Sequence, residues 1–74
     1  MSAQLFNDLV RLRKNRGWTQ AELAEQVGVS RKTINTIENA IYVPSTVLAL
    51  QIAAALDVPI ETVFWLPSDA GPKG

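Results

Sequence analysis

The sequence predicts an all-α fold of five short helices packed into one domain. Its 74 residues are too few for two hydrophobic cores, and a hydrophobic content of 47% is typical of a globular protein. Apolar residues recur at helical spacing along most of the chain, and residues that cap helices separate the apolar segments. The exception is Trp65–Leu66, which could extend as a short C-terminal strand.

The first helix is predicted from Leu5, Leu9 and Leu12, which recur at helical spacing. These leucines form its buried face. The helix is expected to end near Arg16, because Gly17 can adopt the left-handed conformation that closes a helix.

Two helices joined by a tight turn are predicted next. Thr19 is the expected N-cap of the second helix, and Glu22, three residues later, completes a capping box. Gly28 and Val29 make the turn, and Ser30 caps the third helix.

The third helix has an inner and an outer face. At about 100° per residue, Ile34 and Ile37 point inward. Glu38 lies beside them, a costly place for an unpaired carboxylate, so Arg13 of the first helix is its expected partner. A serine cap, a cationic start and small hydrogen-bonding side chains outside are typical of a helix that enters the DNA major groove. The outer residues are Lys32, Asn35, Thr36 and Asn39, with Arg31 and Thr33 on the flanks.

The C-terminal half is predicted to hold two further helices. Pro44–Ser45 opens a fourth helix that runs to about Leu56, and Asp57–Pro59 breaks it. A short fifth helix is expected from Ile60 to Phe64. The domain is therefore assigned to residues 1–66 and a flexible tail to residues 67–74, which include two prolines and two glycines.

The fourth helix is apolar nearly all round, which predicts a second burial partner for its outer face. A twofold homodimer would bury this surface together with the apolar residues before the tail. Phe64 and Trp65 could instead fold back on their own core. The predicted dimer interface, with the short strand included, comprises Val47, Leu50, Ala54, Val63, Phe64, Trp65 and Leu66.

Composition and charge exclude several functions. The chain has neither cysteine nor histidine, so we expect no enzyme, no metal site and no cofactor. No apolar run reaches ~18–20 residues and the N-terminus lacks a secretory signal, so we expect a cytoplasmic protein without a membrane span. The net charge is zero, yet six of the seven basic residues lie within the first 32 positions, which predicts one positive end and few phosphate contacts.

Four segments have the order and spacing of a known family: Arg16–Ala24, Gly28–Ser30, Ile34–Asn39 and Pro44–Ser45. Through them, residues 5–64 resemble the phage-repressor/Cro-like helix-turn-helix family, also called the xenobiotic-response-element family. The Val63–Trp65 ending resembles that of its short stand-alone repressors, of the cytolysin-repressor type. The resemblance implies a lambda-repressor-like fold. It also implies a sequence-specific transcriptional regulator, a repressor, that binds a palindromic operator in double-stranded DNA as a homodimer.

The resemblance also implies roles for single residues. Gln20 would bond a phosphate and brace the recognition helix, and Tyr42 would touch a phosphate on the next strand. Arg13 and Glu38 match the internal ion pair of the family. Asn35 could instead be solvated, and Tyr42 could pack within its loop. The residues expected to contact DNA are Thr19, Gln20, Arg31, Lys32, Thr33, Asn35, Thr36, Asn39 and Tyr42.

The loop after the third helix departs from the family pattern. Ala40–Ile41 stands where short repressors usually carry Gly or Asn and then Lys, and Val43 replaces a common Asn. Two potential phosphate contacts are lost and Ile41 is expected to be exposed, so either non-specific DNA binding is weaker or the loop touches protein. A protein-interaction module on the same fold, such as an antitoxin, is therefore the alternative function.

Overall fold

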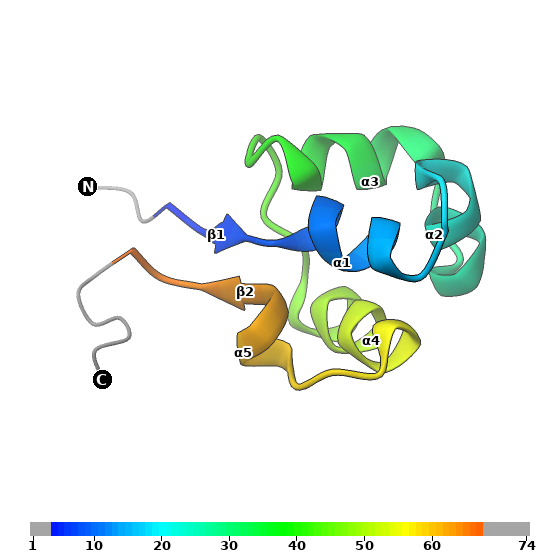
Figure 1. Cartoon of the computed structure of the whole chain (residues 1–74). Helices are drawn as coiled ribbons and strands as arrows, with labels where there is room; N and C mark the ends of the chain where they lie inside the picture. Colours follow the sequence, from blue (N-terminus) through cyan, green and yellow to red (C-terminus); the bar gives the residue numbers. More distant parts are fainter. Residues whose placement is uncertain (1–3, 68–74) are drawn as a thin grey trace.

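The computed structural model describes residues 4–67, which form five helices and a two-stranded sheet (Figure 1). In Figure 1, α3 lies at the top, α4 and α5 lie at the bottom, and the two strands run side by side. In chain order the elements are β1 (Phe6–Asn7), α1 (Leu9–Asn15), α2 (Gln20–Val27), α3 (Arg31–Glu38), α4 (Thr46–Leu56), α5 (Ile60–Val63) and β2 (Phe64–Trp65).

Capping side chains stabilise the starts of α2, α3 and α4, as the sequence predicts. Thr19 forms the complete capping box at the start of α2, and the hydroxyls of Ser30 and Ser45 accept backbone N–H groups at the starts of α3 and α4. Gly17 follows α1 at φ +76° and Gly28 follows α2 at φ +74°, so both adopt the left-handed conformation. The predicted ends of these helices are therefore confirmed.

One hydrophobic core joins all five helices and β2. Each helix is too short to be stable alone, so burial of its apolar face against the others is what stabilises it. The predicted inner face of the third helix is confirmed, since Ile34 and Ile37 are both buried. The largest fully buried side chains are Leu9, Leu23, Ile34, Ile37, Ile52 and Val63.

The expectation that the first helix includes Leu5 is wrong, because residues 6–7 form a strand. Phe6 pairs with Trp65, and Asn7 pairs with Phe64, in an antiparallel register. The side-chain oxygen of Asn7 accepts the N–H of Leu9 at 3.0 Å, which turns the chain into α1 only at that residue. The predicted five-helix fold is therefore present, and a small two-stranded sheet is added to it.

The fifth helix begins at Ile60 as predicted but ends one residue earlier, and the final strand begins and ends one residue earlier than predicted. α5 ends at Val63, and β2 spans Phe64–Trp65 and pairs with β1 of the same chain. Val63 is 0% exposed and Phe64 is 7% exposed. Both belong to the core of their own chain, which leaves them little surface for a dimer contact.

The other predicted dimer residues, Val47, Leu50, Ala54, Trp65 and Leu66, are exposed. Apart from Pro67, the predicted tail lies outside the described residues. Within residues 4–67, no helix has the length and apolar character needed to cross a membrane.

Candidate nucleic-acid interface

The turn between α2 and α3 is closed by backbone hydrogen bonds. The N–H of Val29 donates to the carbonyl of Ala24 at 3.0 Å, and that of Gly28 donates to Glu25 at 3.4 Å. Leu23 and Ile34, both fully buried, hold the two helices to the same core. The result is a pair of short helices whose relative position is fixed by the turn and by the core.

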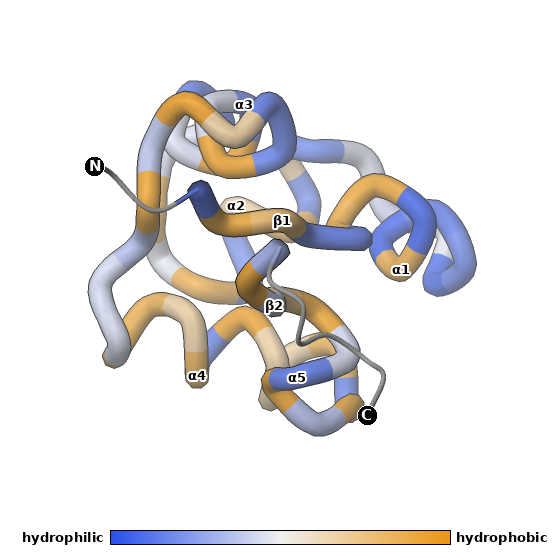
Figure 2. Tube along the Cα trace, turned by 90° about the vertical axis from the view of Figure 1, so that its left-hand side faces the viewer, coloured by the Kyte–Doolittle hydropathy of each residue, from blue (hydrophilic) through white to orange (hydrophobic). Residues whose placement is uncertain are grey.

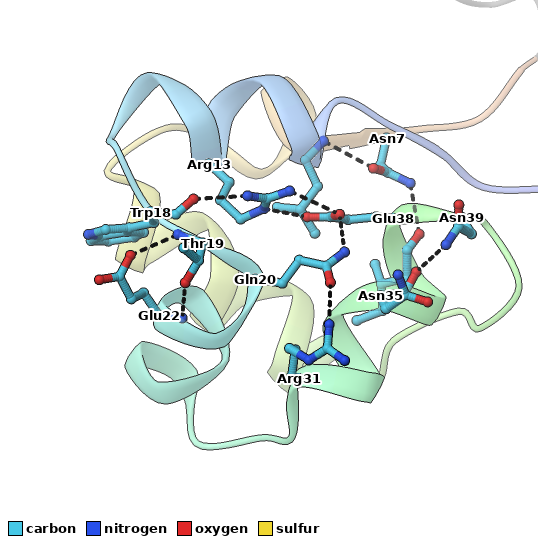
Figure 3. Close-up of polar contacts among 12 residues, drawn as sticks. Asn7, Arg13, Trp18, Thr19, Gln20, Glu22, Arg31, Asn35, Glu38 and Asn39 are labelled. Carbon is cyan, nitrogen blue, oxygen red and sulfur yellow. Dashed lines mark hydrogen bonds and ion pairs between the residues drawn. The ribbon is translucent and has the colours of Figure 1, made fainter.

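A buried ion pair joins α1 to the end of α3 (Figure 3). Nε of Arg13 donates to Oε2 of Glu38 at 2.7 Å, and the two side chains are only 10% and 4% exposed. Nη1 of Arg13 also donates to the carbonyl of Trp18 at 2.9 Å. The predicted pairing of Arg13 with Glu38 is confirmed. Because both charges are buried, loss of either one would leave the other without compensation.

Gln20 extends this network to the exposed start of α3. Its Nε2 donates to Oε1 of Glu38 at 2.8 Å, and its Oε1 accepts a long hydrogen bond from Arg31 at 3.4 Å (Figure 3). Gln20 therefore braces the third helix, as predicted. Its predicted contact with a phosphate stays a prediction.

The outer face of α3 presents cationic and polar side chains. Arg31, Lys32 and Asn35 are exposed, whereas Thr33 and Thr36 are partly buried. The amide of Asn35 makes no hydrogen bond to any residue between positions 4 and 67. A free amide of this kind can pair with an adenine edge or with water.

Three other predicted contact residues use polar groups within the protein. The N–H and hydroxyl of Thr19 both belong to the capping box. Nδ2 of Asn39 donates to the carbonyl of Asn35 at 2.9 Å, at the C-terminal end of α3. Tyr42 is exposed in the following loop, where its N–H donates to the carbonyl of Thr36. The hydroxyl proton of Thr19, Oδ1 of Asn39 and the ring of Tyr42 are left for other contacts.

The basic residues of α1 are largely occupied by contacts inside the protein. Arg11 pairs with Asp8, whose hydrogen bond and negative charge raise the pKa of Arg11. Arg16, which follows α1, donates to the carbonyl of Leu56 at 3.3 Å, and its guanidinium lies 5.0 Å from the centre of the Trp18 ring. Positive charge at the α2–α3 surface therefore comes mainly from Arg31 and Lys32.

Asn7 is a positioning residue that sequence reasoning missed. Its Nδ2 donates to the carbonyl of Ile37 at 3.0 Å, thirty residues along the chain, and so ties β1 to the end of α3 (Figure 3). An asparagine two residues before a helix is a recognisable local signal for a turn. Its contact with α3 has no signal in the sequence.

A model of the helix-turn-helix family matches residues 9–63, which span all five helices. The chain belongs to this family. YgzD of Bacillus subtilis, an uncharacterised HTH-type transcriptional regulator, is 44% identical over 63 residues that cover 85% of this chain and 96% of that protein. An uncharacterised HTH-type transcriptional regulator of Methanothermobacter thermautotrophicus is 52% identical over 58 residues, covering 77% of this chain and 84% of that protein.

A solved structure shares the fold. The master regulator for biofilm formation SinR, in complex with DNA, superimposes with a TM-score of 0.68 and 33% identity. The match covers 73% of this chain and 87% of the SinR chain. The likeness to regulators therefore extends over most of the described domain.

Proposed function

We propose that this helix-turn-helix protein is a sequence-specific DNA-binding transcriptional regulator that inserts α3 into the major groove. The observation that carries the proposal is the network from Arg13 through Glu38 and Gln20 to Arg31. It fixes α3 against α1 and α2 while Arg31, Lys32 and Asn35 stay exposed. A helix that is already held in position, with polar side chains exposed for contact, loses little conformational entropy on binding.

The exposed residues of α3 have chemistry suited to a major groove. Arg31 or Lys32 suits the O6 and N7 acceptors of guanine, and Asn35 suits the N6 and N7 of adenine. Gln20 and the unpaired N–H groups at the start of α2 suit a phosphate. Because few cations are free, affinity is expected to fall with salt less steeply than for a strongly basic protein.

A homodimer on a palindromic operator accounts for the remaining apolar surface. Figure 2 shows that α4 is coloured hydrophobic along much of its length, and Val47 and Leu50 on this helix are exposed. Trp65 and Leu66 add exposed apolar surface at β2. Two copies related by a twofold axis would place their α3 helices in successive major grooves, roughly 34 Å apart. Occupying such a site next to a promoter would make the protein a repressor, as in the cytolysin-repressor type.

The proposal is tested by selecting binding sites from random duplex DNA at near-physiological salt with the purified protein. We expect enrichment of a palindrome whose half-sites lie about one helical turn apart. A single unrepeated half-site would contradict the dimer. If a folded protein enriches no duplex sequence, sequence-specific DNA binding is contradicted.

The dimer has its own test on α4. Leu50→Asp places a charge in the proposed interface, and Gln51→Asp places the same charge on the adjacent exposed position. We expect sedimentation to show monomers for Leu50→Asp and dimers for Gln51→Asp, with operator binding lost only in the former. Monomers in the unaltered protein would overturn the homodimer.

A protein-interaction role, such as that of an antitoxin, is the second candidate. The observation that favours it is the exposure of Ile41, Val43 and Val47, which lie in the loop after α3 and at the start of α4. Exposed apolar groups next to one another in the chain are typical of surfaces that bind protein. This candidate becomes the leading one if the selection enriches no duplex.

A further inference from the structure

A hollow of about 380 Å³ opens beside the outer face of α3. It lies between the first turns of the helix and the loop that follows the helix, and its lining is mostly apolar. The lining residues are Ser30, Lys32, Thr33, Thr36, Ile41 and Tyr42.

The hydroxyl groups of Ser30, Thr33 and Thr36 in this lining are already hydrogen-bonded. Oγ1 of Thr36 donates to the carbonyl of Thr33 at 2.9 Å, and the hydroxyls of Thr33 and Ser30 share a hydrogen bond of 3.0 Å. The hydroxyl of Ser30 also accepts the N–H of Thr33 as the helix cap. The surface that remains available to a ligand is therefore mainly apolar. It consists of the methyl groups of Thr33 and Thr36, the side chain of Ile41 and the ring of Tyr42.

The loop wall of the hollow is positioned by the backbone. The carbonyl of Thr36 accepts the N–H groups of both Ile41 and Tyr42, at 2.9 and 3.2 Å. Ala40 makes the required bend at φ +60°. Ile41 is 75% exposed although its backbone is held in place. Covering this exposed apolar side chain with a ligand would lower the free energy.

The charge around the hollow indicates the kind of ligand. Lys32 lines it, and Arg31 is exposed at the adjacent position of α3. Two cations beside an apolar hollow favour a polyanion that carries an apolar group. On the edges of bases in the major groove, the C5-methyl group of thymine is that group.

We propose that this hollow receives the methyl group of a thymine in each half-site of the DNA. The inference rests on the proposed function and adds a base preference to it. The methyl groups of Thr33 and Thr36, with Ile41 and Tyr42, form the contact surface. Lys32 holds the adjoining phosphate or base.

The test begins with the duplex enriched from random DNA. Each thymine is replaced in turn by deoxyuridine, which removes the methyl group and keeps every hydrogen-bonding group. We expect one thymine per half-site at which this change weakens binding about three- to fivefold, the size expected for burying one methyl group. The other thymines should show little effect.

Protein variants then locate the contact. Thr36→Ser removes a methyl group and keeps the hydroxyl, and Ile41→Ala shortens an exposed side chain without disturbing the core. Each should reduce the difference between thymine and uracil at the sensitive position, because each removes part of the surface that contacts the methyl group. Val43→Ala is the matched control, because Val43 is also exposed in this loop but does not line the hollow. It should keep the full difference.

The outcomes separate the two proposals. If no duplex is enriched, the proposed function fails and this inference fails with it. If a duplex is enriched but replacing thymine by uracil weakens binding at no position, only this inference is overturned. The hollow would then be a candidate site for a protein partner. A sensitive thymine whose effect is the same in Ile41→Ala, Thr36→Ser and the unaltered protein would place its methyl group elsewhere and would also overturn it.

Discussion

The α2 helix and the β1–β2 pair both contact α3, but they are specified in different ways. Caps and a glycine turn taken from the neighbouring sequence define the two helices, with Thr19, Gly28 and Ser30 at their ends. The strands are two residues long and exist only because Phe6–Asn7 meets Phe64–Trp65. Short-range sequence signals therefore specify α2 and α3, which face the proposed DNA. Long-range contacts specify the two strands.

The two regions also differ in the groups that secure them to α3. Gln20 of α2 and the buried Arg13–Glu38 pair, whose arginine lies on α1, secure one side of α3, whereas a single asparagine amide and apolar burial secure the strand side. Breaking a buried charge pair costs more free energy than breaking neutral hydrogen bonds. The two sides of α3 should therefore respond differently to substitution.

The largest effect is expected from Glu38→Ala. It leaves Arg13 buried without a carboxylate and removes the acceptor of Gln20, so the free energy of unfolding should fall by about 3–5 kcal/mol. Urea unfolding measures the change. Glu25→Ala, an exposed glutamate on α2, is the control and should change stability by less than about 0.5 kcal/mol. Equal losses in the two variants would mean that the ion pair does not secure α3.

The next effect concerns binding rather than stability. The double substitution of Arg31 and Lys32 by alanine should lower affinity for the selected duplex at least about 100-fold, because base and phosphate contacts are lost together. Stability should change by less than about 0.5 kcal/mol, since both side chains are exposed and the hydrogen bond from Arg31 to Gln20 is long. The double substitution of Arg11 and Lys14 removes the same charge from α1. If that control lost as much affinity in an anisotropy titration, net charge rather than the α3 surface would govern binding.

Asn7→Ala tests the strand side. It removes the hydrogen bonds to Leu9 and to Ile37, so stability should fall by about 1–3 kcal/mol, less than for Glu38→Ala. Hydrogen exchange should quicken at the end of α3. Asn15→Ala, at the exposed end of α1, is the control and should leave that exchange unchanged. If Asn7→Ala lowered the free energy of unfolding as much as Glu38→Ala does, the two regions would not differ in how strongly they secure α3.

The smallest effect is expected where α3 meets its loop. Ala40 is exposed at φ +60°, so Ala40→Gly relieves backbone strain and should raise stability by about 0.5 kcal/mol after the entropy cost of glycine. The same substitution in a helix, Ala21→Gly, should lower stability by about 1 kcal/mol. Thermal unfolding of both variants checks the opposite signs. A loss at Ala40 would mean that its conformation is not strained.

Sequence reasoning succeeded where the partner of a residue lies nearby or where its chemistry allows few partners. The buried faces of α2, α3 and α4 follow from helical spacing. The pairing of Arg13 with Glu38 spans 25 residues, yet a carboxylate beside an inward face requires a cation, and Arg13 flanked the facing apolar stripe. The sequence did not predict that the hydroxyls of Thr33 and Thr36 form hydrogen bonds within the protein. These bonds decide which groups of the outer face remain available to contact a base.

By itself, the sequence determined the ends of α2, α3 and α4, because the capping side chains and the left-handed turns act on backbone groups within a few residues. Only the tertiary structure decided that residues 6–7 leave the first helix for a strand, and that Val63 and Phe64 turn inward. Asn7 bonds Ile37, thirty residues away, and Asp8 donates its N–H to the carbonyl of Val63. Helical periodicity does not encode such contacts, since they form only when the two ends of the chain meet over a shared core.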